Sequence, residues 1–131
     1  MNKTILVTGA LLGVLAVLLG AFGAHGLKGL IDADALQSFE TGVRYQMYHA
    51  LLLLFTGSTD YIGATRKKTI FILILTGVIF FSGSVYGLAT NALSGFDFTK
   101  TAFVTPVGGA LLITAWVVLL WSFIRLRTKV A

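Results

Sequence analysis

Two histidines are the residues of this 131-residue sequence with the most distinctive chemistry. His25 and His49 each lie in an apolar stretch. Two imidazoles that face each other in a helix bundle could be the axial ligands of a haem or part of a metal site. No carboxylate is placed clearly enough to supply a third ligand, so the alternative is a hydrogen-bonded histidine near a membrane surface. The sequence establishes no cofactor, and a haem or metal at these histidines stays one alternative.

Arg44 is the charged residue with the most informative neighbours. Glu40 precedes it by four residues, the favourable order for an ion pair along a helix. Tyr45 and His49 are also four residues apart, so they share a helix face. We interpret Glu40 and Arg44 as an ion pair that anchors a helix at the membrane interface. The alternative is that Arg44 binds an anionic lipid headgroup or a small anion.

Hydroxyl groups accompany the two later apolar stretches. Ser82, Ser84 and Tyr86 lie in the string FFSGSVYG, and Thr105 precedes Pro106. We expect these hydroxyls to form hydrogen bonds between helices, which are common and individually modest in membranes. The proline falls about one turn into its helix, where it costs little.

Small residues recur at helical spacing in the first apolar stretch. Intervals of four, three, four and three residues place on one stripe Gly9, Gly13, Ala16, Gly20 and Gly23. Such a stripe lets another backbone approach closely, and Gly108 and Gly109 permit the same near the last helix. We expect packing within the chain, and the alternative is an interface between the subunits of a homo-oligomer.

The composition identifies the solvent of this chain as lipid. Of its residues, 56% are apolar and only 11% are charged, and the mean hydropathy is +0.91. The basic residues behind the net charge of +5 lie at the ends of apolar stretches, which indicates membrane topology and no nucleic-acid partner. The chain has no cysteine, so thiolate chemistry and disulfides are excluded.

Four apolar stretches predict an all-α membrane protein, a single domain over residues 1–131. The expected spans are residues 4–25, 43–59, 69–90 and 102–124. Short loops make neighbouring helices antiparallel, which predicts a four-helix transmembrane bundle. A cleaved signal peptide is the rival interpretation of the first stretch, but that stretch is longer than a typical signal core.

An amphipathic helical segment is expected between the first two spans. Asp34 and Gln37 have the spacing of a capping box, so a helix is predicted to begin near Asp34. Apolar residues then recur every three or four positions towards the second span. We expect one long helix or two helices joined at Gly42, either on the membrane surface or folded into the bundle.

The positions of lysine and arginine predict the orientation. Seven basic residues lie on one side, namely Lys3, Arg66, Lys67, Lys68, Arg125, Arg127 and Lys129, against Lys28, Arg44 and Lys100 on the other. Cytoplasmic flanks carry the excess of positive charge. Both termini are therefore predicted in the cytoplasm of a cell whose plasma membrane holds the protein.

Four strings resemble those of a known family. They are GAFGAHGL, TGVRYQMYHALLLL, FSGSVY and TPVGG, in order over nearly the whole chain. Together they are similar to the bacterial domain-of-unknown-function 423 family, which transmembrane protein 256 of animals also resembles. Leu52 stands where that family has a smaller residue, a departure that bears on packing. The resemblance implies a four-span bacterial plasma-membrane protein and no established reaction; the matching residues are His25, Gly26, Arg44, Tyr45, Tyr48, His49, Gly83, Ser84, Thr105, Pro106 and Gly108.

The predicted topology brings all four strings to the outer half of the bundle. We therefore expect a shared polar pocket that opens outwards and that could bind a lipid or small ligand. Polar groups at that depth are costly unless they are satisfied, so the cluster is a candidate site. Its expected members are His25, Arg44, Tyr45, His49, Ser84, Tyr86 and Thr105.

Three functions fit these residues. The first is a non-enzymatic membrane module that binds a lipid, a small ligand or a second subunit. The second is a small oligomeric transporter or channel, although no repeat and no mid-span charge in three of the four spans supports it. The third is a redox protein with haem or metal at His25 and His49. No catalytic constellation of motif-level specificity is present, so the sequence favours the first.

Overall fold

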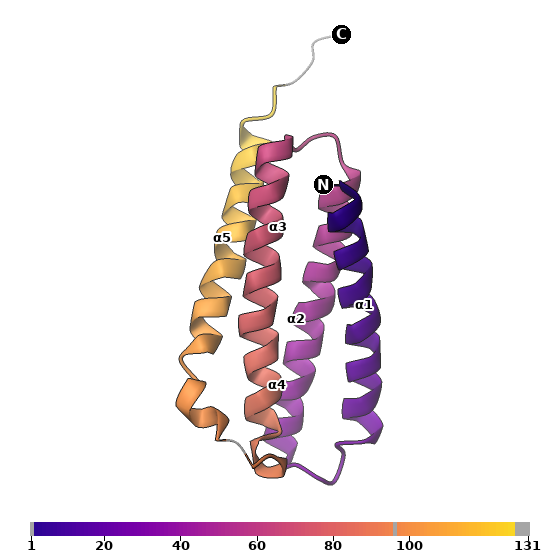
Figure 1. Ribbon diagram of the computed structural model, residues 1–131, viewed down its shortest axis with the longest axis vertical. Helices are drawn as coiled ribbons and strands as arrows, with labels where there is room; N and C mark the ends of the chain where they lie inside the picture. Colours follow the sequence, from indigo (N-terminus) through magenta and orange to yellow (C-terminus); the bar gives the residue numbers. More distant parts are fainter. Residues whose placement is uncertain (1, 96, 128–131) are drawn as a thin grey trace.

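The computed structural model describes residues 2–95 and 97–127, and those residues form an all-helical protein. The helices are α1 (Asn2–His25), α2 (Ala33–Ser58), α3 (Ala64–Val78), α4 (Ser84–Ala89) and α5 (Val104–Ile124). One π-helical turn, η1 (Ile79–Gly83), joins α3 to α4 without a break, and the 3₁₀ turns η2 (Asn91–Leu93) and η3 (Phe98–Thr101) lead to α5. Figure 1 shows each long helix antiparallel to the next.

Three helical segments are long and apolar enough to cross a membrane. They are Asn2–His25, the continuous rod Ala64–Ala89 and Val104–Ile124. The predicted first and fourth spans coincide with α1 and α5, and the third begins five residues earlier than predicted. The predicted second span is only the latter part of α2, whose first half also carries Asp34, Glu40 and Arg44.

The start of α2 corrects the predicted capping box. The N-cap is Asp32, whose carboxylate accepts a hydrogen bond of 2.7 Å from the Ala35 amide. Asp34 lies in the first turn instead, where its charge complements the positive end of the helix dipole. The helix continues through Gly42 without a break, and the missing side chain there makes room for the Tyr86 ring.

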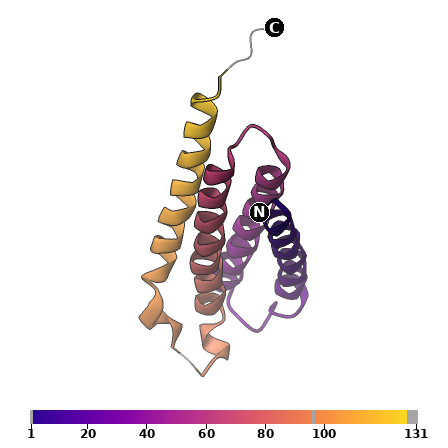
Figure 2. The same cartoon turned by 45° about the horizontal axis from the view of Figure 1, so that its top comes forward.

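The long helices pack mainly against their neighbours in the sequence, and α2 also touches α5 through ring contacts. α1 packs along α2, α2 packs against α3, η1 and α4, and α3 packs against α5. In Figures 1 and 2, α2 lies behind α1 and α3, and α5 lies beside α3 on the side away from α1. This order leaves a groove on each side of the α3–η1–α4 rod.

The main core lies where α2, α3 and α5 meet, together with the start of α1. Its buried members are Ile5, Leu52, Leu53, Ile62, Ile70, Ile74, Val78, Leu112, Ala115 and Leu119. A smaller cluster at the other end holds Leu27, Phe39 and Ala89. Many large apolar side chains are instead exposed, including Val7, Val14 and Val17 on α1. A helix surface of this kind is suited to contact with lipid.

The small-residue stripe of α1 faces α2 for most of its length. A Cβ at Gly9 would lie 3.0 Å from the Ala50 carbonyl oxygen, and one at Gly23 would lie 3.0 Å from the Phe39 ring. Ala16 is buried, and Gly20 faces Val43. These positions therefore pack within the chain. At Gly13, in contrast, a side chain would meet open space.

The π-helical turn is held from both sides. The Ser82 hydroxyl donates a 2.7 Å hydrogen bond to the Gly42 carbonyl oxygen of α2. On the other side α5 comes so close that a Cβ at Gly108 would lie 2.3 Å from the Phe81 amide nitrogen. Within η1 the bonding pattern is i to i+5, so residues after it face differently from those of an uninterrupted α-helix.

Candidate membrane-facing groove and aromatic pocket

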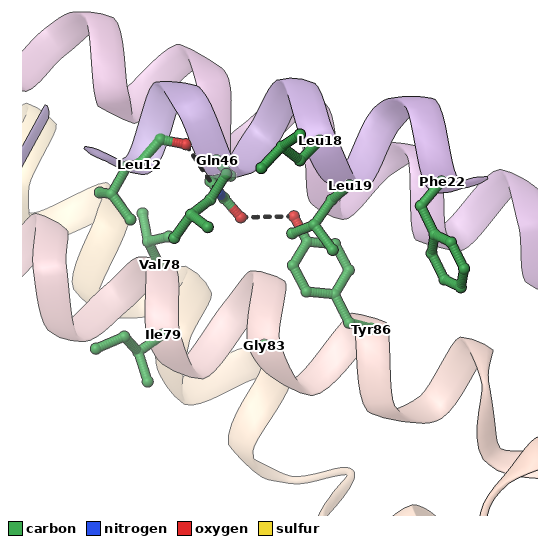
Figure 3. A pocket seen from close by; sticks show the side chains of 10 residues that line it. Leu12, Leu18, Leu19, Phe22, Gln46, Val78, Ile79, Gly83 and Tyr86 are labelled. Carbon is green, nitrogen blue, oxygen red and sulfur yellow. Dashed lines mark hydrogen bonds between the residues drawn. The ribbon is translucent and has the colours of Figure 1, made fainter. Parts of the chain in front are cut away.

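An apolar groove of about 460 Å³ lies between α1 and the rod of α3, η1 and α4. Its volume falls within the roughly 300–1,000 Å³ of typical ligand sites. α2 forms its floor, as Figure 3 shows. Nearly all the side chains around it are apolar; the lining residues are Leu12, Leu15, Leu18, Leu19, Phe22, Gln46, Val78, Ile79, Gly83 and Tyr86.

Gln46 is the centre of the groove floor and joins three helices. Its side-chain amide donates a 2.8 Å hydrogen bond to the Leu12 carbonyl oxygen of α1. Its Oε1 accepts a 2.7 Å hydrogen bond from the Tyr86 hydroxyl of α4. Gln46 is buried, and Figure 3 shows the two bonds in line across the groove. The polar groups of the floor are thus bonded to one another.

A second pocket of about 290 Å³ lies on the opposite side of the rod, between α2 and α5. Aromatic side chains form much of its wall. Its lining residues are Tyr45, His49, Phe81, Gly109, Leu112, Ile113 and Trp116. We call it the aromatic pocket.

His49 fixes the geometry of the aromatic pocket. Its Nδ1 lies 2.7 Å from the Tyr45 carbonyl oxygen, which can only accept, so Nδ1 carries the proton. Nε2 therefore accepts the 3.1 Å hydrogen bond from the Trp116 indole. Both ring nitrogens are occupied in a neutral imidazole, so neither is free to bind a metal.

His25 does not meet His49. It ends α1 with an exposed side chain, whereas Gly9 is the α1 residue that contacts Ala50, next to His49. The 16 residues from Gly9 to His25 span roughly 24 Å of helix. The two histidines therefore do not face each other as the haem or metal alternative requires, and His49 is a hydrogen-bonded histidine. Among residues 2–95 and 97–127, no three histidine or acidic side chains gather as they would around a metal ion.

The predicted ion pair is also replaced by another contact. The Arg44 guanidinium donates a 3.0 Å hydrogen bond to the Thr41 hydroxyl, one turn back on α2. In the described part of the chain, Arg44 forms no ion pair with Glu40. Both side chains are exposed.

The shared outer pocket is not formed. Tyr86 lines the groove, whereas Tyr45 and His49 line the aromatic pocket on the other side of the rod. Ser84 and Thr105 form a short hydrogen bond of 2.5 Å between α4 and α5. The remaining two, His25 and Arg44, are exposed outside both cavities. The predicted pocket fails because the α3–η1–α4 rod lies between the residues that it was expected to unite.

Sequence reasoning missed Gln46. An amide amid the aromatic and apolar residues that follow Arg44 is costly in lipid unless it is bonded, and this was the available signal. The leucines of α1 that line the groove gave no such signal, because lipid-facing and groove-facing leucines look alike in sequence.

Comparisons with known proteins find relatives that are named membrane proteins. The sequence profile of a family described as "Protein of unknown function (DUF423)" matches residues 19–109. The UPF0382 membrane protein YwdK of Bacillus subtilis is 37% identical over 94% of this chain and 98% of its own. The UPF0382 inner membrane protein YgdD of Escherichia coli is 34% identical over 98% of this chain and 95% of its own. No solved structure matches the chain.

Proposed function

The chain belongs to the DUF423 family. We propose that it is a four-span protein of the bacterial plasma membrane that binds a lipid acyl chain. The binding site is the groove between α1 and the α3–η1–α4 rod. The protein acts by binding and not by catalysis. The apolar groove with its internally bonded polar floor carries this proposal.

The chemistry of the groove favours a hydrocarbon chain as the occupant. Gln46 already bonds to Leu12 and Tyr86, so the floor offers little to a polar headgroup. Leucine side chains and Phe22 of α1 form one wall, and Val78 and Ile79 contribute to the other. In a bilayer these walls face acyl chains, which gain packing contacts with the groove and need no hydrogen bond. The floor likewise provides no free acid, base or nucleophile for a reaction.

The fourth span in this proposal is α2. It packs along α1 and also along the α3–η1–α4 rod, both of which are long and apolar enough to cross. A helix that lies between two spans and antiparallel to both crosses with them. Arg44 lies near the middle of α2 rather than at its outer end, and its guanidinium bonds to the Thr41 hydroxyl, one turn towards that end.

The orientation follows from charge. The end of the molecule that holds the start of α1, the α2–α3 loop and the end of α5 carries Lys3, the tract Arg66, Lys67 and Lys68, Arg125 and Arg127. This end faces the cytoplasm in our proposal. Lys67 also joins α3 to α1 at this end, because its ammonium group donates a 3.2 Å hydrogen bond to Oδ1 of Asn2.

Single-cysteine labelling tests this topology, because the chain has no cysteine of its own. The exposed positions Gly63 and Ala92 lie at opposite ends of the molecule. We expect Ala92→Cys to react with a membrane-impermeant maleimide on intact cells, and Gly63→Cys to react only after permeabilisation. Equal labelling of both variants on intact cells would contradict a four-span topology.

A larger side chain in the groove is expected to prevent lipid from binding there. Gly83 lines the groove and a side chain there meets open space, so Gly83→Leu fills the groove without a clash. Native mass spectrometry from mild detergent should show phospholipid adducts on the wild type and at least a fivefold loss of them in G83L, since the leucine occupies the same volume. Equal adducts in both proteins would refute the groove as the site.

Gly13→Leu is the matched control for this experiment. It makes the same change at a position with the same open space, but Gly13 is outside the groove lining. G13L should keep its lipid adducts. The same spectra report subunit number, so loss of a dimer in G13L alone would place Gly13 at an interface between two copies, and an unchanged subunit number would remove the Gly13 interface.

A further inference from the structure

The aromatic pocket differs from the groove in its chemistry. The Tyr45 and Phe81 ring centroids are 5.1 Å apart, and the Tyr45 ring is nearly parallel to that of His49, at an interplanar angle of 24°. The Trp116 ring meets His49 edge-on at 6.1 Å. Four rings from α2, η1 and α5 thus border a space of about 290 Å³, which suits a single small ring system.

The occupant of this pocket must be neutral. None of the lining residues is acidic or basic apart from His49, whose two hydrogen bonds fix it as neutral. A cation above aromatic rings gains a modest attraction. A charge within the membrane also loses its hydration, and this loss costs more than the attraction supplies. The cost exceeds the gain, so a lipophilic cation is a poorer ligand than an uncharged ring.

The pocket also has one uncommitted donor. Tyr45 lines it, and within the described residues its hydroxyl has no hydrogen-bond partner, unlike the Tyr86 hydroxyl on the other side of the rod. A hydroxyl in lipid gains most from an acceptor that arrives with the ligand. The rim residues Tyr45, Ile113 and Trp116 are exposed, so a ligand can enter from the bilayer.

We infer that the aromatic pocket binds the head ring of a prenylated quinone. The flat neutral ring packs among Tyr45, Phe81 and Trp116, a carbonyl oxygen accepts from the Tyr45 hydroxyl, and the prenyl tail leaves over Ile113 into lipid. His49 is a positioning residue that holds Trp116 by a hydrogen bond. This inference concerns a second site, separate from the acyl-chain groove, and involves binding alone.

Tryptophan fluorescence tests the inference on the full chain. The chain has two tryptophans, Trp116 in the pocket wall and Trp121 outside it. W121F leaves only Trp116, in the pocket wall, and W116F leaves only Trp121, which lies further along α5 and outside the pocket lining. Titration of detergent-solubilised protein with a benzoquinone that carries two isoprene units should quench W121F saturably. W116F should show only the weak, linear quenching caused by quinone that has partitioned into the detergent. Linear and equal quenching of both proteins would overturn the inference.

Three further variants in the W121F background separate the pocket from its surroundings. Tyr45→Phe should weaken quinone affinity about 5- to 10-fold, the effect of one hydrogen bond. Tyr48→Phe, outside the pocket lining, should leave affinity unchanged. Gly109→Leu should abolish saturable quenching, because its side chain extends into the pocket beside Phe81. Full affinity in both the Tyr45 and Gly109 variants would contradict the assigned site.

G83L separates this result from the acyl-chain proposal. Its added side chain fills the groove on the other side of the rod, so quinone affinity should be unchanged. Loss of lipid adducts with quinone binding retained supports two independent sites. Unchanged lipid adducts with quinone binding retained would refute the groove and leave the aromatic pocket standing.

Discussion

Replacement of Gly108 by leucine is expected to prevent α5 from docking on the rest of the molecule. A Cβ at this position would lie 2.3 Å from the Phe81 amide nitrogen and 2.8 Å from the Phe80 carbonyl carbon. Both are backbone atoms of η1, so no side-chain rotation relieves the clash, and η1 is also tied to α2 through Ser82. The expected loss of stability is about 3 kcal/mol or more, at the upper end of overpacking effects. Size-exclusion chromatography and thermal unfolding in detergent measure it.

The adjacent glycine supplies the control. A Cβ at Gly109 would meet the Phe81 ring at an ordinary contact distance of 3.7 Å. Gly109→Ala should therefore elute and unfold like the wild type. If G108L were as monodisperse and as heat-stable as the wild type, the close approach of α5 to the π-helical turn would be wrong.

Replacement of Gln46 by leucine is expected to destabilise the protein by about 1–3 kcal/mol. The change removes the bonds that join α2 to Leu12 and Tyr86. It also leaves the Tyr86 hydroxyl without its acceptor beside an apolar groove, which costs more than the bond itself. The midpoint of thermal unfolding in detergent should fall accordingly.

The double variant Gln46→Leu with Tyr86→Phe distinguishes the bond from simple packing. It removes both partners, so no hydroxyl is stranded, and it should recover part of the stability lost in Q46L. Additive losses in the double-mutant cycle would show that Gln46 and Tyr86 act independently, contrary to the structure.

Hydropathy was sufficient to predict the three long apolar helical segments, because span length and polar loops are properties of the sequence itself. Residues 4–25 and 102–124 were predicted almost to their ends. The start of α2 was misplaced by two residues, since Asp32 and Asp34 are both able caps and only the local backbone selects the first. The family was also recognisable, since the four strings lie in order along the chain.

The sequence could not predict which side chains share a site, because the direction in which a helix face points depends on how the helices pack. The π-helical turn is an example. Ser82 inside it points to Gly42 on α2, whereas Ser84 just after it bonds to Thr105 on α5. Nothing in the string FFSGSVYG predicts the extra residue of a π turn. The predicted topology could not assign these side chains to the two sides of the rod.

Photocrosslinking in a bilayer tests the central claim, that an acyl chain occupies the groove, most directly. The protein would be reconstituted with a phospholipid that carries a diazirine midway along one chain, irradiated, digested and mapped by mass spectrometry. The account predicts adducts concentrated on groove residues such as Leu15, Leu19 and Ile79, with a marked loss of them in G83L. Adducts spread evenly over outward-facing residues such as Val7 and Val17, and unchanged by G83L, would contradict it.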